Sequence, residues 1–185
     1  NVGRFLNNYG DTTLKTSGIR AYVINVSVST VLSDSFLPFL KGFMPQHRFP
    51  KNSFFLALSC DEIAGHEDAL RPVIAMLHPL GVRFLARSYH PEQTNSASLK
   101  NLGFEAVAIS RDTLQNAILS QSSTSSFIRM VTEFEESGII IVVNGVTSKD
   151  ERDFCYDMAV PFYIDNREVH NLTPQDFITK LNYQR

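Results

Sequence analysis

The chain has 185 residues, of which 43% are hydrophobic and 19% are charged, so it can bury a core and form one globular domain. Its formal net charge of −2 argues against a dedicated nucleic-acid-binding protein. No apolar run approaches the roughly 20 residues that a membrane-spanning helix needs. We therefore expect a cytoplasmic domain, which can belong to a membrane-anchored protein. Its two cysteines, Cys60 and Cys155, lie far apart and are expected to be free buried thiols.

Apolar strand patterns and helical patterns alternate along the chain. Buried strands are predicted over residues 21–28, 54–59, 82–86, 106–109, 139–143 and 162–164. Helices are predicted over residues 2–14, 36–43, 68–78, 91–102, 112–119, 127–136 and 149–158, and after Thr173-Pro174. The polar segment 121–126 is expected to be a flexible connection.

This alternation predicts an α/β fold with parallel strands and helical crossovers, either a doubly wound sheet or a (β/α)8 barrel. A barrel needs roughly 250 residues. The chain would therefore be an incomplete TIM-like barrel that lacks the first strand and helix, and it opens abruptly, as a part of a longer protein would.

The segment 139–153, IIIVVNGVTSKDERD, contains the clearest strand and helix signal. Its run of five β-branched residues suits a strand that is buried on both faces. Ser148 and Glu151 have the spacing of a capping box, which predicts a helix after the turn at Asn144-Gly145. Residues 149–153 are expected to form the polar face of that helix.

No motif for a known chemistry stands out. The chain has no glycine-rich phosphate loop, no GxSxG and no HExxH. Its histidines do not cluster at metal-ligand spacing: His47, His66, His78, His90 and His170. Asp61 and Glu62 follow a strand, where adjacent carboxylates either cap the next helix or form a catalytic pair; we favour capping.

The strand ends matter because the carboxyl ends of parallel strands carry the functional groups in α/β folds. The residues at or just after the predicted strand ends are Asn25, Ser59, Cys60, Arg87, Ser88, Ser110, Asn144, Asp165 and Asn166. A metal-dependent hydrolase needs several carboxylates there, because Mg²⁺ prefers anionic oxygen ligands. Only Asp165 supplies one.

The order of these segments resembles the EAL domains, cyclic di-GMP phosphodiesterases with a barrel fold. The segments that carry the resemblance are AYVINVSVS (residues 21–29), LALSCDE (56–62), LGVRF (80–84), SLKNLGFEAVAIS (98–110) and VVNGVTS (142–148), with Asp165 near a sixth. The resemblance runs over residues 18–166 and implies a single EAL-like domain over residues 1–185, the C-terminal part of a GGDEF-EAL type protein.

In this family two metal ions are held by carboxylates and an asparagine, and a lysine supports the attacking water. Asn25 falls on the asparagine ligand. The other matching positions carry residues without the expected chemistry: Cys60 for a glutamate, Arg87 and Ser88 for two aspartates, Ala108 for the lysine, Ser110 for an aspartate and Asn144 for a glutamate. A cation such as Arg87 in a metal site would repel the metal ion. The resemblance therefore implies that these seven positions are vestiges of a catalytic site, and that the chain has no catalytic activity, no bound metal and no cofactor.

We accordingly expect a degenerate, non-catalytic EAL domain that acts through a regulatory protein partner. Such extensive loss resembles the CsrD/MshH type of regulator, which implies control of small RNA turnover and a phosphotransferase-system IIA protein as partner. We expect no direct nucleic-acid binding, and we do not expect cyclic di-GMP to bind. Two alternatives stay open: a cyclic di-GMP receptor without hydrolysis, to which Arg87 and Arg111 would supply charge, and an active phosphodiesterase.

Overall fold

A computed structural model describes residues 21–46, 49, 52–91, 94–160 and 162–165. The predicted first helix, the helix after Thr173-Pro174 and His170 lie outside these residues. Within them, no helix is both long and apolar enough to span a membrane.

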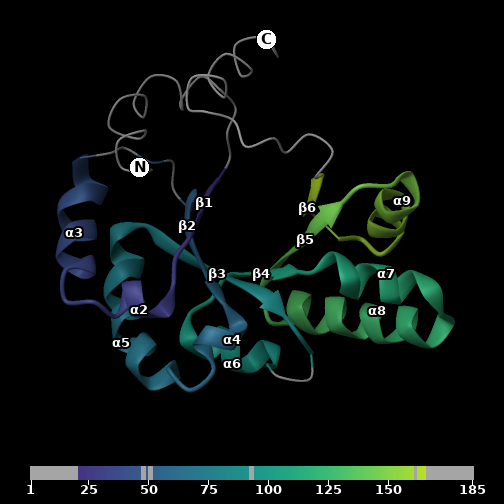
Figure 1. Ribbon diagram of the computed structural model, residues 1–185, viewed down its shortest axis with the longest axis horizontal. Helices are drawn as coiled ribbons and strands as arrows, with labels where there is room; N and C mark the ends of the chain where they lie inside the picture. The colour runs from purple at the N-terminus through teal and green to yellow at the C-terminus, as the bar shows by residue number, and fades with distance from the viewer. Residues whose placement is uncertain (1–20, 47–48, 50–51, 92–93, 161, 166–185) are drawn as a thin grey trace, which may run out of the picture.

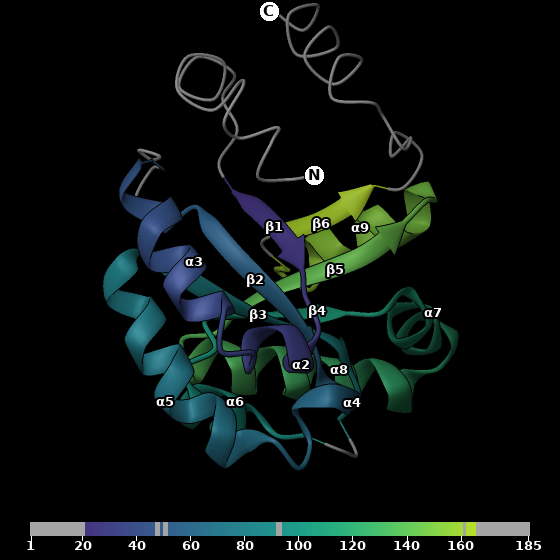
Figure 2. The same cartoon turned by 60° about the vertical axis from the view of Figure 1, so that its left-hand side comes forward.

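Six parallel strands form one sheet, and their order in space follows their order in the chain. The strands are β1 (Tyr22–Asn25), β2 (Phe54–Ser59), β3 (Val82–Tyr89), β4 (Ala106–Ile109), β5 (Ile140–Val146) and β6 (Phe162–Asp165). The sheet curls, with helices along its outer side (Figures 1 and 2). The predicted incomplete barrel is thus confirmed, because β1 and β6 are the two ends of the described sheet.

Helices or short helical turns connect the strands. They are α2 (Val28–Val31), α3 (Phe36–Phe43), η1 (Met44–Gln46), α4 (Cys60–Ile63), α5 (Glu67–Leu77), η2 (His78–Leu80), α6 (Ser96–Leu102), α7 (Arg111–Leu119), α8 (Gln121–Glu136) and α9 (Lys149–Asp157). Polar side chains begin several of them: Asn95, Ser110 and Ser120 accept hydrogen bonds from the backbones of α6, α7 and α8. Gly103 ends α6 at a φ of 96°, in the left-handed region that suits glycine.

The sheet has two unequal faces, which we call outer and inner. The outer face packs against the helices in a large apolar cluster that contains Phe54, Phe84 and Phe134. The inner face holds a small cluster of Ala57, Leu85, Ala106 and Ala108, with Phe55 and Val142 packed against it. The main core therefore lies on the helix side. The four residues of the inner cluster are buried too, whereas Val23 and Ile140 on the same face are 52% and 42% exposed.

Two predictions about local structure are wrong. Residues 121–126 are the first turns of α8, because Ser120 caps the helix and serine is tolerated where side chains face outward. The strand β5 is buried on one face only, since Ile140 on its inner face is 42% exposed. A run of β-branched residues shows that a strand forms, but it does not show that both faces are covered.

We predict that Phe84→Ala lowers the free energy of unfolding by about 3–5 kcal/mol, because the deletion leaves a cavity in the outer cluster. Phe84 is fully buried and lies edge-on to the rings of His78 and Phe104, at centroid distances of 5.7 and 5.9 Å. Urea unfolding would measure the change. Tyr156→Ala, at a site that is 85% exposed, is the control and should change stability by less than about 0.5 kcal/mol. Equal effects of the two substitutions would contradict this description of the core.

Candidate functional site

The strand register places four of the predicted site residues on the inner face, near the carboxyl ends of the strands. Asn25 lies beside Ala57 of the inner cluster. Alternation along a strand then puts Arg87 on the same face, two residues after Leu85. By the same rule Asn144 follows Val142, and Ala108 belongs to the inner cluster itself. We call Asn25, Arg87, Ala108 and Asn144 the inner edge.

Ser88 breaks this alternation. Its φ is 56°, in the left-handed region, and the pairing of β3 with β4 shifts register between Ala86 and Tyr89. Tyr89 consequently lies in the outer cluster, although it is two residues beyond Arg87. Ser88 therefore marks the point at which β3 changes the face to which its side chains point.

Arg87 is incompletely paired. Its Nη2 lies 4.0 Å from Oε1 of Glu62, which is an ion pair without a short hydrogen bond. Its Nε is buried and has no hydrogen-bond partner among the described residues. A buried guanidinium N–H without an acceptor is costly, so an acceptor from solvent or from a ligand would stabilise this atom.

Glu62, which we weighed as a helix cap or as half of a catalytic pair with Asp61, lies beside Arg87 of the inner edge. We expected Asp61 and Glu62 to cap the next helix, but both lie within the first turn of α4. The Oε2 of Glu62 accepts a hydrogen bond from the backbone N–H of Val28 at 2.7 Å. Glu62 thereby links the end of β2 to α2 while its other oxygen faces Arg87. The only signal for this in the sequence was its position just after a strand.

Cys60 does not join the inner edge. It begins α4, is 2% exposed and belongs to the outer cluster. Burial raises the pKa of its thiol to about 11; Asp61 adds to this rise, and a hydrogen bond with Thr94 opposes it. The thiol therefore stays protonated at neutral pH, and it lies among apolar side chains away from the inner edge. Both cysteines are free and buried, as predicted.

Ser110 and Arg111 both have structural partners. The Ser110 hydroxyl accepts a hydrogen bond from the backbone N–H of Thr113 at 3.2 Å and so caps α7. The Nε of Arg111 donates to Oε1 of Glu151 at 2.9 Å, and its Nη2 donates to the Thr147 hydroxyl. Arg111 is thus already engaged by Glu151 and Thr147, while its contribution of charge to a nucleotide stays a prediction.

Glu151 lies in a buried network, not on a solvated helix face as we expected. It is 4% exposed, and it completes the predicted capping box with Ser148. Its carboxylate accepts hydrogen bonds from the backbone N–H groups of Thr147 at 2.7 Å and Ser148 at 3.0 Å, and from Gln115 at 3.0 Å. Burial alone would raise its pKa, but these hydrogen bonds and the one from Arg111 outweigh it and hold the pKa at about 2.

The described residues of the inner edge do not fit a divalent metal ion by themselves. Asn25 and Asn144 offer amide oxygens, but Arg87 brings a positive charge between them. Across the described residues, no three His, Cys, Asp or Glu side chains lie close enough together to hold a metal ion. The arrangement suits an anion better than a cation.

We predict that Glu151 makes folding stability depend on pH at the acid end. Its pKa falls from an ordinary 4.5 to about 2 on folding, so its stabilisation is fully present above pH 4.5. It is lost as the pH falls from 4.5 towards 2, with an amplitude of at most about 3 kcal/mol. Urea unfolding between pH 2 and pH 7 would measure it.

Glu151→Gln should remove most of this pH dependence and should destabilise the chain at pH 7, because an amide cannot accept all of these hydrogen bonds. Asp150→Asn, in the same helical turn, is the matched control and should behave like the wild type. An unchanged pH profile in Glu151→Gln would show that the network does not stabilise the fold.

Comparison with known proteins identifies the family. The family model described as EAL domain matches residues 4–163. No curated protein matches the chain significantly. Among solved structures, the EAL domain of DcpA from Mycobacterium smegmatis has a TM-score of 0.78 at 17% identity, covering 99% of this chain and 79% of that one.

Two further matches are complexes with cyclic di-GMP. The FimX EAL domain from Pseudomonas aeruginosa, bound to c-di-GMP, has a TM-score of 0.71 at 14% identity, covering 78% of this chain and 60% of that one. The PaMucR phosphodiesterase in its c-di-GMP complex has a TM-score of 0.69 at 14% identity, covering 83% of this chain and 64% of that one. This chain thus spans less than two thirds of either protein.

These findings correct the expectation that the chain is not an enzyme. The family model covers most of the chain, and the matched structures include one described as a phosphodiesterase. Substitutions at six of the seven compared positions are therefore not sufficient to exclude an activity. The expectation against cyclic di-GMP is weakened in the same way, because two of the matched proteins bind it. The match over residues 4–163 shows that this chain belongs to the EAL domain family.

Proposed function

We propose that this chain is a regulatory domain of cyclic di-GMP signalling and that it binds cyclic di-GMP at the inner edge. The observation that carries the proposal is the state of Arg87. Its guanidinium lies at the carboxyl end of β3 and its buried Nε has no acceptor among the described residues. A phosphate oxygen of the nucleotide would supply that acceptor.

The chemistry of the two groups is complementary. Each of the two phosphodiester groups of cyclic di-GMP carries a negative charge, and a guanidinium can donate two parallel hydrogen bonds to such a group. The exposed amides of Asn25 and Asn144 lie on the same face and offer both donors and acceptors. Asn25 and Asn144 are exposed and Arg87 is partly exposed, so a ligand can reach all three side chains.

Similar proteins support this assignment. The FimX EAL domain and PaMucR share the fold and are described as bound to c-di-GMP. The carboxyl ends of barrel strands are also the general location of ligand sites in this architecture. Cyclic di-GMP would accordingly bind at the carboxyl ends of the strands, with one of its phosphate groups hydrogen-bonded to Arg87.

We predict that Arg87→Ala weakens cyclic di-GMP binding roughly 10- to 100-fold, the usual worth of a charge-assisted hydrogen bond. Glu62→Gln should instead strengthen binding several-fold, because it removes the carboxylate that competes for Arg87. Its amide oxygen can still accept the hydrogen bond from Val28. Isothermal titration calorimetry with purified chain would measure both changes.

Lys41→Ala is the control, since it removes an exposed cation of α3 away from the inner edge. The same samples should be assayed for hydrolysis with Mg²⁺ and Mn²⁺, which tests the phosphodiesterase alternative directly. Loss of binding in Arg87→Ala alone supports the proposal. Equal binding by the wild type and Arg87→Ala, or no binding by the wild type, contradicts it.

Regulation through a protein partner is a second candidate function. Exposed apolar side chains favour it: Leu119 is 79% exposed at the end of α7, next to Ile118 at 39%, and Ile128 of α8 is 45% exposed. Large exposed apolar patches mark interaction sites, and Ile118 with Leu119, which are adjacent in the chain, would form the centre of such a patch. The resemblance to the CsrD/MshH type names a phosphotransferase-system IIA protein as the partner to test.

We predict that a purified IIA protein binds the chain and that Leu119→Ser weakens this complex at least tenfold, because the substitution removes exposed apolar surface. Surface plasmon resonance would measure the affinity. Tyr156→Ser is the control, since Tyr156 is equally exposed but lies on α9. Identical affinities of the wild type and Leu119→Ser, or no complex with the wild type, would remove the support for this second candidate.

A further inference from the structure

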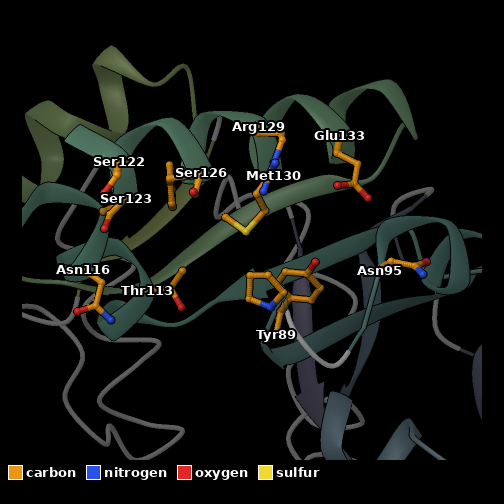
Figure 3. Close-up of a pocket in the computed structure, with 13 residues that line it drawn as sticks. Tyr89, Asn95, Thr113, Asn116, Ser122, Ser123, Ser126, Arg129, Met130 and Glu133 are labelled. Atoms are coloured by element: carbon orange, nitrogen blue, oxygen red, sulfur yellow. The ribbon is translucent and has the colours of Figure 1, made fainter. Parts of the chain in front are cut away.

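A cleft of about 540 Å³ lies on the outer side of the molecule, between α7, α8 and the end of β3 (Figure 3). It is separate from the inner edge, because Tyr89 at its base belongs to the outer cluster. Ser88 is the residue at which β3 turns from one face to the other, so Arg87 and Tyr89 serve two different surfaces. Neither the family match nor the inner edge accounts for this cleft.

The cleft has an apolar base and polar walls. Tyr89, Phe127 and Met130 form the base and are 3%, 3% and 6% exposed. The Tyr89 ring packs edge-on against Phe134 at a centroid distance of 4.9 Å, which fixes its position. The walls carry small hydroxyl and amide side chains from both helices: Thr113 and Asn116 of α7, and Ser122, Ser123 and Ser126 of α8.

The length of the cleft is set by α8. The residues that line it run from Ser122 to Glu133, eleven steps of a helix, or about 16 Å at 1.5 Å per residue. Figure 3 shows the α7 side chains opposite the first half of this row, with Tyr89 and Asn95 opposite the second half. An extended peptide rises about 3.3 Å per residue, so about five residues fit along it.

The charge of the cleft is uneven. Arg129 lies in the middle of the row and is exposed, with no carboxylate within ion-pair distance among the described residues. Glu133, one turn further on, already accepts a hydrogen bond from the Ser96 hydroxyl at 2.7 Å. The first turn of α8 adds its partial positive charge at the other end. A hydrogen bond from a neutral hydroxyl leaves the negative charge of Glu133 in place, so the cleft holds one charge of each sign. Among the described residues, Arg129 is the one of the two without a hydrogen-bonded partner, so its positive charge is the one left for a ligand.

From these features we infer that the cleft binds an extended peptide segment of another protein, with an acidic side chain opposite Arg129. An apolar side chain of the same segment rests on Tyr89, Phe127 and Met130. The hydroxyls and amides of the walls bond to the peptide backbone, which every sequence offers, so specificity comes from the acidic and apolar positions. The inference does not depend on cyclic di-GMP, which concerns the opposite face of the sheet.

A library of random seven-residue peptides displayed on phage, selected on the purified chain, tests this inference. Enriched peptides should carry Asp or Glu within three residues of an apolar side chain. Synthetic labelled copies, followed by fluorescence polarisation, should bind Arg129→Glu at least tenfold more weakly than the wild type. Lys41→Glu makes the same charge change on α3 and should bind them within twofold of the wild type.

A second variant tests the place of binding without changing charge. Ser126 is exposed on the wall of the cleft, so Ser126→Trp should block the peptides while the chain stays folded by circular dichroism. Selection of no peptide, selection without an acidic preference, or equal binding to Arg129→Glu and the wild type would each overturn the inference. Peptide binding in the absence of cyclic di-GMP also keeps this result separate from that of the Arg87 experiment.

Discussion

The architecture depends on satisfying the backbone groups where a strand becomes a helix, and Glu151 shows how this is done. Its carboxylate receives two backbone N–H groups of its own turn and side chains from α7, so it joins β5, α9 and α7. A buried carboxylate with this many donors stays ionised and holds the elements at fixed positions. Glu62 makes one such hydrogen bond between α4 and α2.

The polar residues at the strand ends fall into two groups: those that are hydrogen-bonded within the chain and those that remain available for a ligand. Ser110, Arg111 and Glu151 are committed to the chain's own backbone and side chains. Asn25, Arg87 and Asn144 share the inner face. Among the described residues, Asn25 and Asn144 have no side-chain hydrogen bond, and Arg87 has only its 4.0 Å ion pair with Glu62. Arg87 is the member whose hydrogen bonding is incomplete, because its Nε is buried without an acceptor among the described residues. This unsatisfied donor makes Arg87 a candidate ligand-binding residue, whereas Ser110 and Glu151 have structural roles as helix caps.

Much of this could be predicted from the sequence. The alternation of strand and helix patterns predicted the parallel strands, and the spacing of Ser148 and Glu151 predicted the capping box. The burial of Glu151 could not be predicted, since it depends on Arg111 and Gln115, which are 40 and 36 residues away. The left-handed backbone conformation of Ser88 could not be predicted either. Strict alternation along the strand would put Tyr89 on the inner face, but the bulge at Ser88 places it in the outer cluster. The seven positions taken from the resemblance also separate in space, because Cys60 lies in the outer cluster.

The central claim is that the Arg87 Nε–H lacks an acceptor until cyclic di-GMP supplies one. Nuclear magnetic resonance of the arginine Nε–H groups observes this atom directly, with Arg87→Lys to assign its signal. We predict that adding cyclic di-GMP shifts the Arg87 signal and slows its exchange with water, while the Arg111 signal, already bonded to Glu151, stays in place. An unchanged Arg87 signal at saturating nucleotide would contradict the claim.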